Sequence, residues 1–328
     1  MKKDFNVFGK LNYQVSNQVS IYGDLQYRLI DYKIDGKDDD QRDISQQHEF
    51  SFINPKFGVF YDLSENQNIY LSVAVANREP NRDNYIDAHP EKPLPTSERL
   101  YDYEMGYTIR SADLLLGINL YYMNYKDQLV LTGEINDVGA AVMTNINKSY
   151  RAGIELTTGI KLFPGLNWDL NATFSRNKIK DFTEYVDNWS YWDDPVNEPF
   201  QYINELGETD LAFSPGIIAG SQISYEVLKD MFINLISKYV GNQYIDNTSS
   251  VERLLEAYFV NDIRIQYLLK TKLFKELGIN LFVNNIFSVK YETNAWIYRY
   301  YIQGEPDIID GYFPQAGINF LAGLSLQF

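Results

Sequence analysis

Aromatic and basic side chains gather in two segments of the chain, and their types suit ligand binding. They are Tyr185, Trp189, Tyr191 and Trp192 in the first segment, and Trp296, Tyr298, Arg299, Tyr300 and Tyr301 in the second. Aromatic rings stack on flat ligands, and an arginine adds a cation–π contact. Alternatively, the rings fold their segments on themselves or lie at a membrane interface. The pattern therefore predicts ligand-binding loops, with a purely structural role as the competing interpretation.

A third candidate segment carries Arg78 and Arg82, with Arg99 farther along the chain. Paired basic side chains can hold the carboxylates or phosphates of an anionic ligand. The acids of the same segment, Asp83, Asp87, Glu91 and Glu98, could instead pair with these arginines. Both interpretations stay open from the sequence.

Residues typical of catalysis or metal binding are scarce in the chain. There is no cysteine, and the two histidines, His48 and His89, stand in no recognisable nucleophile or metal motif. The acidic runs at 38–40 and 193–194 lack the spacing of a calcium loop. We therefore predict no catalytic residue, no bound metal and no cofactor.

The charge balance excludes nucleic acid as a partner. The net charge is −15, with 29 Lys and Arg against 44 Asp and Glu. Binding to phosphates needs a basic footprint that displaces counterions. No run of about 18 apolar residues predicts a membrane helix, so any insertion into a membrane must use strands.

Alternating side chains predict the elements that position these residues. In 153–162, Ile154, Leu156 and Ile160 share one face, whereas Glu155 and Lys161 share the other. The same pattern predicts about 13 strands. They are 5–15, 19–32, 50–62, 68–77, 99–110, 114–130, 153–162, 167–175, 217–227, 231–244, 259–269, 279–289 and 319–328.

The connections between these strands alternate in length. Short links fall at 17–18, 64–67, 111–112, 163–165, 228–230 and 271–277. Long links fall at 33–49, 78–98, 131–145, 181–213, 245–257 and 290–315. Outer-membrane barrels have short periplasmic turns and long extracellular loops. The predicted fold is thus all-β, a transmembrane antiparallel β-barrel whose candidate binding residues lie outside the cell.

The N-terminus does not fit a complete barrel. No apolar segment of a signal peptide follows Met1, and counting back from Phe328 places the first strand's start on the loop side. Bacterial barrels are normally even-stranded and begin in the periplasm. We therefore expect residues 1–328 to be the C-terminal part of a larger barrel.

Several local patterns resemble the TonB-dependent receptors of the outer membrane, particularly those of Bacteroidetes. The segments are 52–56 leading to Tyr61 (FINPK), 76–85 (ANREPNRDNY), 149–156 (SYRAGIEL), 238–247 (KYVGNQYIDN) and 283–287 (VNNIF), with the terminal Phe328. Together they cover most of the chain in a consistent order. The resemblance implies a barrel of about 22 strands with an N-terminal plug, and this chain holds neither the plug nor the first strands.

The resemblance also implies a function and partners. The whole protein would take up a bulky nutrient across the Gram-negative outer membrane, with an iron–siderophore complex as the first expectation. Its partners would be membrane lipid, a small-molecule or metal-chelate ligand, the TonB–ExbB–ExbD complex acting through the plug, and the barrel assembly machinery acting on the C-terminal strand. The chain would not be an enzyme.

Other functions share the same strand pattern. A passive porin or channel would have the same alternation and aromatic ending, with an open lumen. Cobalamin, haem or an oligosaccharide could replace the iron complex as cargo. An adhesive barrel, whose loops bind surfaces, is a third possibility. No residue type in the sequence decides among these functions.

Overall fold

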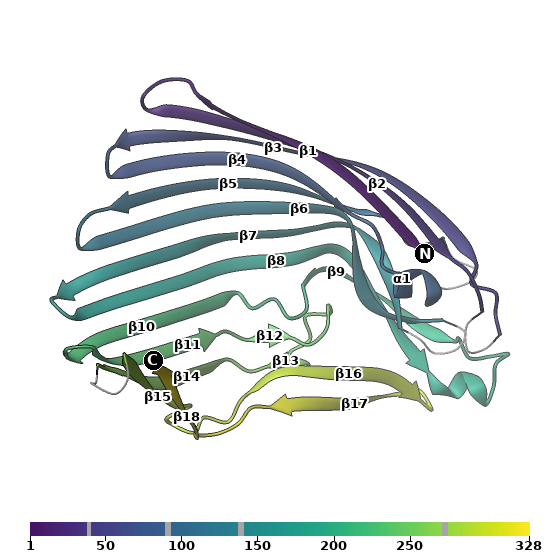
Figure 1. Cartoon of the computed structure of the whole chain (residues 1–328). Helices are drawn as coiled ribbons and strands as arrows, with labels where there is room; N and C mark the ends of the chain where they lie inside the picture. Colours follow the sequence, from purple (N-terminus) through teal and green to yellow (C-terminus); the bar gives the residue numbers. More distant parts are fainter. Residues whose placement is uncertain (38–40, 89–92, 137–140, 271–274) are drawn as a thin grey trace.

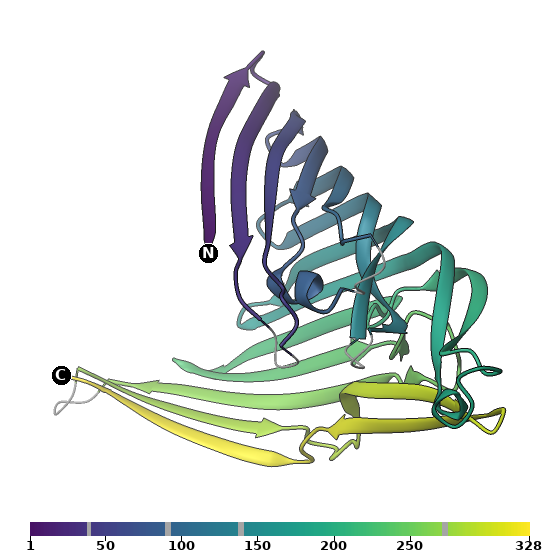
Figure 2. The same ribbon diagram turned by 90° about the vertical axis from the view of Figure 1, so that its right-hand side faces the viewer.

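One curved antiparallel sheet dominates the molecule. The structure is a computed structural model that describes residues 1–37, 41–88, 93–136, 141–270 and 275–328. Each strand of its continuous path pairs with the next strand along that path, and the sheet curves into an open trough (Figures 1 and 2). The strands are β1 (Lys2–Gln14), β2 (Val19–Ile34), β3 (Gln46–Ser64), β4 (Gln67–Arg78), β5 (Glu98–Arg110), β6 (Leu114–Ile135), β7 (Ala141–Phe163), β8 (Leu166–Asn188), β10 (Ile217–Leu228), β11 (Met231–Val240), β14 (Tyr258–Leu269), β15 (Glu276–Asn284) and β18 (Asn319–Gln327).

The remaining elements lie in the long connections. They are α1 (Arg82–Ile86), the 3-10 helix η1 (Trp189–Trp192), β9 (Gln201–Asp210), β12 (Gln243–Tyr244), β13 (Leu254–Leu255), β16 (Glu292–Ile302) and β17 (Glu305–Pro314). β9 pairs with β8, and β16 pairs with both β17 and the end of β8. No helix in the described part of the chain is long and apolar enough to cross a membrane.

The thirteen predicted strands correspond to the thirteen strands of the continuous path, so the all-β antiparallel prediction is confirmed. Several details were wrong. The strand predicted at 231–244 ends at Val240. Part of the loop predicted at 131–145 is strand, because β6 runs to Ile135 and β7 begins at Ala141. The strand predicted to reach residue 289 ends at Asn284, because Asn285 has a positive φ of 50°. The segments 181–213 and 290–315 are not plain loops, because they contain β9, β16 and β17.

We call the continuous path of thirteen strands the wall. Its outer face carries an unbroken apolar row across nine strands. Each residue stands directly opposite the next on the neighbouring strand, from β1 to β10. The residues are Tyr13, Ile21, Val59, Leu71, Met105, Leu120, Ile154, Phe174 and Ile217. A row of this kind suits contact with lipid chains.

The inner face carries a mainly polar row one residue away from the apolar row. It consists of Asn12, Tyr22, Gly58, Ser72, Glu104, Tyr121, Gly153 and Ser175. Tyr70 and Glu155 lie on the same face, and both hydrogen-bond to Asn119. Successive side chains in a strand point to opposite faces, so the alternation in the sequence produces two unlike surfaces.

The short turns gather at one end of the strands and the long connections at the other (Figure 1). At the loop end, α1 lies on the concave side of the sheet (Figure 2). Its Tyr85 packs with Ile34 and Phe50, which lie on the polar, inner face. The polar face is therefore the concave one.

Among the described residues β1 pairs only with β2 and β18 only with β15, so the sheet has two open edges, and the exposed Phe328 follows β18.

Candidate functional site

Two hairpins at the loop end position the aromatic candidate residues. β8 continues past the wall to Asn188, with an irregularity in its pairing at Asp181, where φ is 55°. The β16–β17 hairpin reaches the same place, because Tyr300 and Tyr301 lie in parallel register with Asp187 and Asn188. Segments more than 100 residues apart in the sequence thus lie side by side.

The two predicted aromatic clusters meet at Trp189. Its ring stacks on Tyr300 with the ring centroids 3.9 Å apart, and its indole Nε1 donates a hydrogen bond of 3.0 Å to the hydroxyl of Tyr298. The Tyr298 hydroxyl in turn donates to the buried carboxylate of Asp187. Burial and this bond raise the pKa of Tyr298 to about 12, so the hydroxyl stays a donor at neutral pH.

A buried charge network lies beside these rings. The carboxylate of Glu184 on β8 accepts from Arg253 at 3.0 Å and from Arg299 at 2.6 Å. Asn204 of β9 also donates to it, and Arg253 pairs with Asp246. Only 7% of the Glu184 side chain and 5% of the Arg253 side chain are exposed, so these charges interact in a poorly solvated place. Glu184 therefore joins three long connections.

The remaining aromatic candidates lie on the same two hairpins. Tyr191 packs edge-on against Trp192 and Phe200 at the tip of the first hairpin. Trp296 lies over Gly311 of the paired strand β17. Trp192 is 68% exposed and Trp296 is 48% exposed, so both rings present surface to the surroundings. Tyr185 lies beside Gly133, whose positive φ lets the two backbones approach.

The basic candidates Arg78 and Arg82 lie in a different place, at the connection between β4 and β5. Arg78 pairs with the buried carboxylate of Glu98 at 2.6 Å, while its own side chain stays 68% exposed. Arg82 is the first residue of α1 and is exposed. Within the described residues, no hydrogen bond, ion pair or ring contact links these two arginines to the aromatic cluster.

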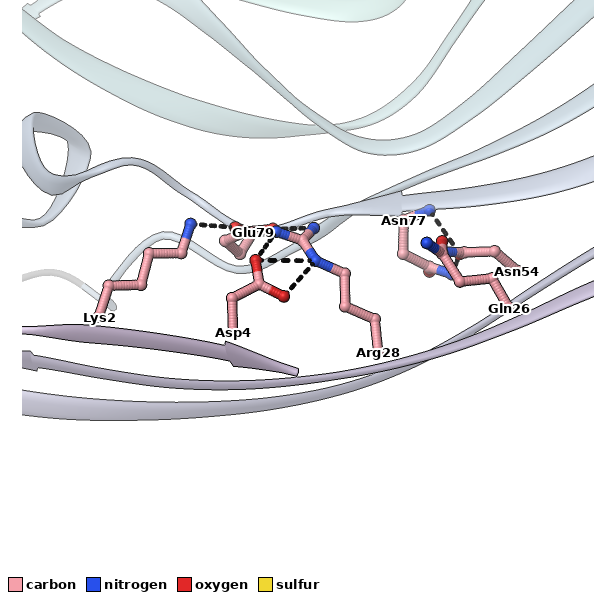
Figure 3. Close-up of polar contacts among 7 residues, drawn as sticks. All are labelled: Lys2, Asp4, Gln26, Arg28, Asn54, Asn77 and Glu79. Atoms are coloured by element: carbon pink, nitrogen blue, oxygen red, sulfur yellow. Dashed lines mark hydrogen bonds and ion pairs between the residues drawn. The ribbon is translucent and has the colours of Figure 1, made fainter. Parts of the chain in front are cut away.

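A second ion network ties this connection to the N-terminal strands (Figure 3). Glu79 accepts from Lys2 at 2.5 Å and from Arg28 at 3.0 Å, and Arg28 also pairs with Asp4. The neighbouring amides of Gln26, Asn54 and Asn77 are hydrogen-bonded to one another. Arg28 and the charged side chains around it are thus paired with one another. In this conformation Arg28 has a structural role.

The helix α1 is held over the inner face by packing and by its caps. Asn81 and Asn84 form a reciprocal capping box, and Tyr85 stacks on His48 with the ring centroids 3.8 Å apart. Burial lowers the pKa of His48 and raises that of Tyr85. His48 has a packing role here, and His89 lies outside the described residues. No group of carboxylates and histidines with metal-binding geometry occurs in the described part of the chain.

Three charged residues that lie beside the aromatic rings were not predicted from the sequence. They are Glu184, Arg253 and Asp187. Each stands among many loop charges, and nothing in its spacing singles it out. Only the pairing of β8 with β16 brings Glu184 close to Arg299. The buried charge could therefore not be recognised before the fold was known.

Comparison with known proteins identifies the family to which the chain belongs. A family model described as the TonB dependent receptor-like β-barrel matches residues 2–286. The chain belongs to the TonB-dependent receptor β-barrel family. Proteins of this family are receptors and transporters of the outer membrane rather than enzymes, and they bind ligands and interact with TonB.

Relatives of this receptor barrel are distant but cover it almost completely. The pesticin receptor of Yersinia enterocolitica is 22% identical over 306 residues, which are 87% of this chain and 41% of that protein. The structure of the ferric-catecholate import receptor Fiu from K12 E. coli aligns with a TM-score of 0.70 at 17% identity, over 100% of this chain and 45% of that one. The siderophore receptor PiuA from Acinetobacter baumannii gives a TM-score of 0.75 at 13% identity, over 98% and 43%.

The chain spans less than half the length of these relatives. At such low identity the structural likeness shows the fold alone. The fold agrees with the family model, which confirms the predicted receptor-barrel family. Whether the loop residues contact a ligand stays a prediction.

Proposed function

We propose that this chain forms the loop-bearing C-terminal part of an outer-membrane receptor that captures a metal-chelate nutrient, with an iron–siderophore complex as the first candidate. The aromatic cluster carries the proposal, because Trp192 and Trp296 expose ring surface on the two hairpins that the Arg299–Glu184 pair joins. Flat, conjugated chelators stack on such rings. The relatives whose names include siderophore or ferric import support the cargo class.

Uptake through this barrel would follow the division of labour implied by the family. The loops capture the complex, and a plug domain coupled to the TonB–ExbB–ExbD complex opens the path through the lumen. The present chain supplies the capture surface and part of the wall, and it takes no part in chemical catalysis. A plug and further strands are needed for transport.

Tryptophan fluorescence tests the capture step. Three of the four tryptophans, Trp189, Trp192 and Trp296, lie in the aromatic cluster, whereas Trp168 lies on the wall. Titration of the purified receptor with a ferric catecholate complex should quench the fluorescence of the Trp168→Phe variant as strongly as that of the wild type. The double variant Trp192→Phe and Trp296→Phe should lose most of the quenching and bind about tenfold more weakly or worse, since stacking on one ring is worth about 0.5–1.5 kcal/mol.

Growth on the same complex tests transport. Cells that depend on this receptor should import the ferric complex only while TonB is present. Uptake that persists without TonB would instead support a passive channel. Unchanged quenching in the double tryptophan variant would contradict the aromatic cluster as the capture site.

A further inference from the structure

Four cations form a straight row on the outer face of the wall, at its loop end. Arg99, Lys126, Lys148 and Lys180 stand directly opposite one another on β5, β6, β7 and β8. We call them the basic row. Each lies six residues beyond a member of the apolar outer row on its own strand, so it shares that row's face. The basic row therefore faces the surroundings of the barrel and not its lumen.

An aromatic belt separates the basic row from the apolar surface. Tyr103 and Tyr122 occupy the first row above the apolar row, and Tyr101 and Tyr150 occupy the second. Ring centroids are 6.4 Å apart for Tyr103 and Tyr122, and 6.0 Å apart for Tyr122 and Tyr150. Tyrosine belts of this kind mark the depth at which hydrocarbon gives way to lipid headgroups.

The basic row lies just above this belt. Lys148 is two residues beyond Tyr150 on the same strand. At a rise of about 3.4 Å per residue and a tilt of about 40°, the step adds about 5 Å of height. The Nζ of Lys180 also lies 5.4 Å from the centre of the Tyr150 ring, so the cations and the belt are in contact. This height is the level of the headgroup phosphates.

The charges of the basic row are only partly compensated by the protein. On β8, Lys180 and Arg176 pair with Glu208, and Lys178 pairs with Asp210. Lys126 and Lys148 are exposed and form no ion pair with any described residue. Like charges placed directly opposite on neighbouring strands are unfavourable. A chain with a net charge of −15 thus concentrates cations at a depth where lipid headgroups carry negative phosphates.

We propose that the basic row is a binding site for a phosphate-bearing lipid of the outer leaflet, with Lys126 and Lys148 as its central contacts. The lipid chains lie along the apolar outer row, the tyrosines contact the glycerol or sugar region, and the lysines pair with the headgroup phosphates. The proposal rests on the orientation of the barrel in the membrane. It does not depend on which nutrient the loops capture.

Lipid binding to the whole receptor in detergent tests this site. The probe is phosphatidic acid, with phosphatidylcholine of the same acyl chains and inorganic phosphate as comparisons, and the readout is the bound lipid counted by native mass spectrometry. Each removed charge should weaken phosphatidic acid binding about fivefold, and Lys126→Gln with Lys148→Gln about 25-fold. The charge-preserving pair Lys126→Arg and Lys148→Arg should bind normally.

A matched control removes the same charge from the other face. Lys10 and Lys56 lie on the inner face, so Lys10→Gln with Lys56→Gln should leave lipid binding unchanged. The proposal fails if this control loses as much affinity as the outer pair, or if the outer pair binds phosphatidic acid like the wild type. Equal competition by inorganic phosphate would also overturn it, because the site would then recognise a free anion. Quenching by the ferric complex should be the same in all these variants, so failure of the lipid site is distinguishable from failure of the proposed cargo.

Discussion

The ring of Tyr70 on β4 lies directly over Gly106 on β5, so close that a Cβ built on Gly106 would be 1.9 Å from the Tyr70 Cε1 atom. Tyr22 covers Gly58 and Tyr121 covers Gly153 in the same way. In each pair the tyrosine and the glycine stand directly opposite each other on neighbouring strands, and both lie on the inner face. The glycines leave room for large rings to lie flat on the wall, and the rings cover backbone that would otherwise be bare.

A methyl group at Gly106 should therefore destabilise the wall. The Gly106→Ala variant must displace Tyr70 and break its bond to Asn119, at a cost of about 1–3 kcal/mol. Gly9→Ala is the matched control, because nothing lies within 4 Å of that position. Urea unfolding in lipid vesicles measures both. Adding Tyr70→Ala should make the Gly106→Ala change nearly neutral, and a full additional loss in that double variant would contradict the packing described.

The two faces of β7 should respond oppositely to an added charge. Leu156→Arg places a cation among lipid chains and should cost about 2–4 kcal/mol, whereas Thr157→Arg faces the lumen and should cost little. Folding into vesicles, followed by the shift of the folded band on unheated gels, reports assembly. Equal effects of the two variants would show that the faces are assigned wrongly.

Removal of the charge of Glu184 should loosen the hairpins without unfolding the wall. Glu184→Gln leaves Arg253 and Arg299 without their shared counter-charge, and loss of one member of a buried pair costs about 3–5 kcal/mol. Amide exchange in β9 and β16 should accelerate, while exchange in β5 and β6 stays the same. Glu208→Gln serves as the control, since its partners Arg176 and Lys180 are exposed and such pairs are worth little. Faster exchange in the wall strands as well would point to a global effect.

Acidification should loosen α1 by protonating His48. This residue lies on the inner face of β3 at the loop end, farther along the strand than the level of the apolar outer row. Burial against Tyr85 lowers the pKa of His48, so the folded state favours the neutral ring. The stabilisation is complete above the unfolded pKa of about 6.5 and is lost as the pH falls through the lower folded value. Amide exchange of residues 82–86 should therefore be faster at acid pH than at pH 7.5. His48→Phe, which keeps a stacked ring, should remove this dependence, and an unchanged pH response in that variant would exclude His48 as its cause.

The wall could be predicted from the sequence because its strands and turns are specified by residues that are close together in the chain. Each strand shows its faces through alternation, as Ile154 and Glu155 do, and each turn of a meander connects neighbours in the chain. The predicted strands were often too short at the loop end. β7 begins 12 residues before the predicted strand 153–162, and β8 ends 13 residues after the predicted strand 167–175. In these extensions the outer face is no longer apolar, so the alternating pattern fades.

The site depends on contacts that the sequence does not encode locally. Tyr185–Trp192 and Trp296–Tyr301 could be recognised as aromatic segments, but not that Trp189 stacks on Tyr300 or that Glu184 joins Arg253 to Arg299. The basic row escaped notice for the same reason, since Arg99, Lys126, Lys148 and Lys180 are spread over 82 positions of the chain and align only in the register of four paired strands.

Neighbouring residues of the chain are enough to predict an antiparallel wall with one apolar and one polar face, because side-chain alternation and turn length are local properties. Which loops meet, which charges are buried and which cations share a depth became visible in the folded chain alone. Those relationships depend on strand register and on the folding of long connections, which bring together residues separated by up to 116 positions.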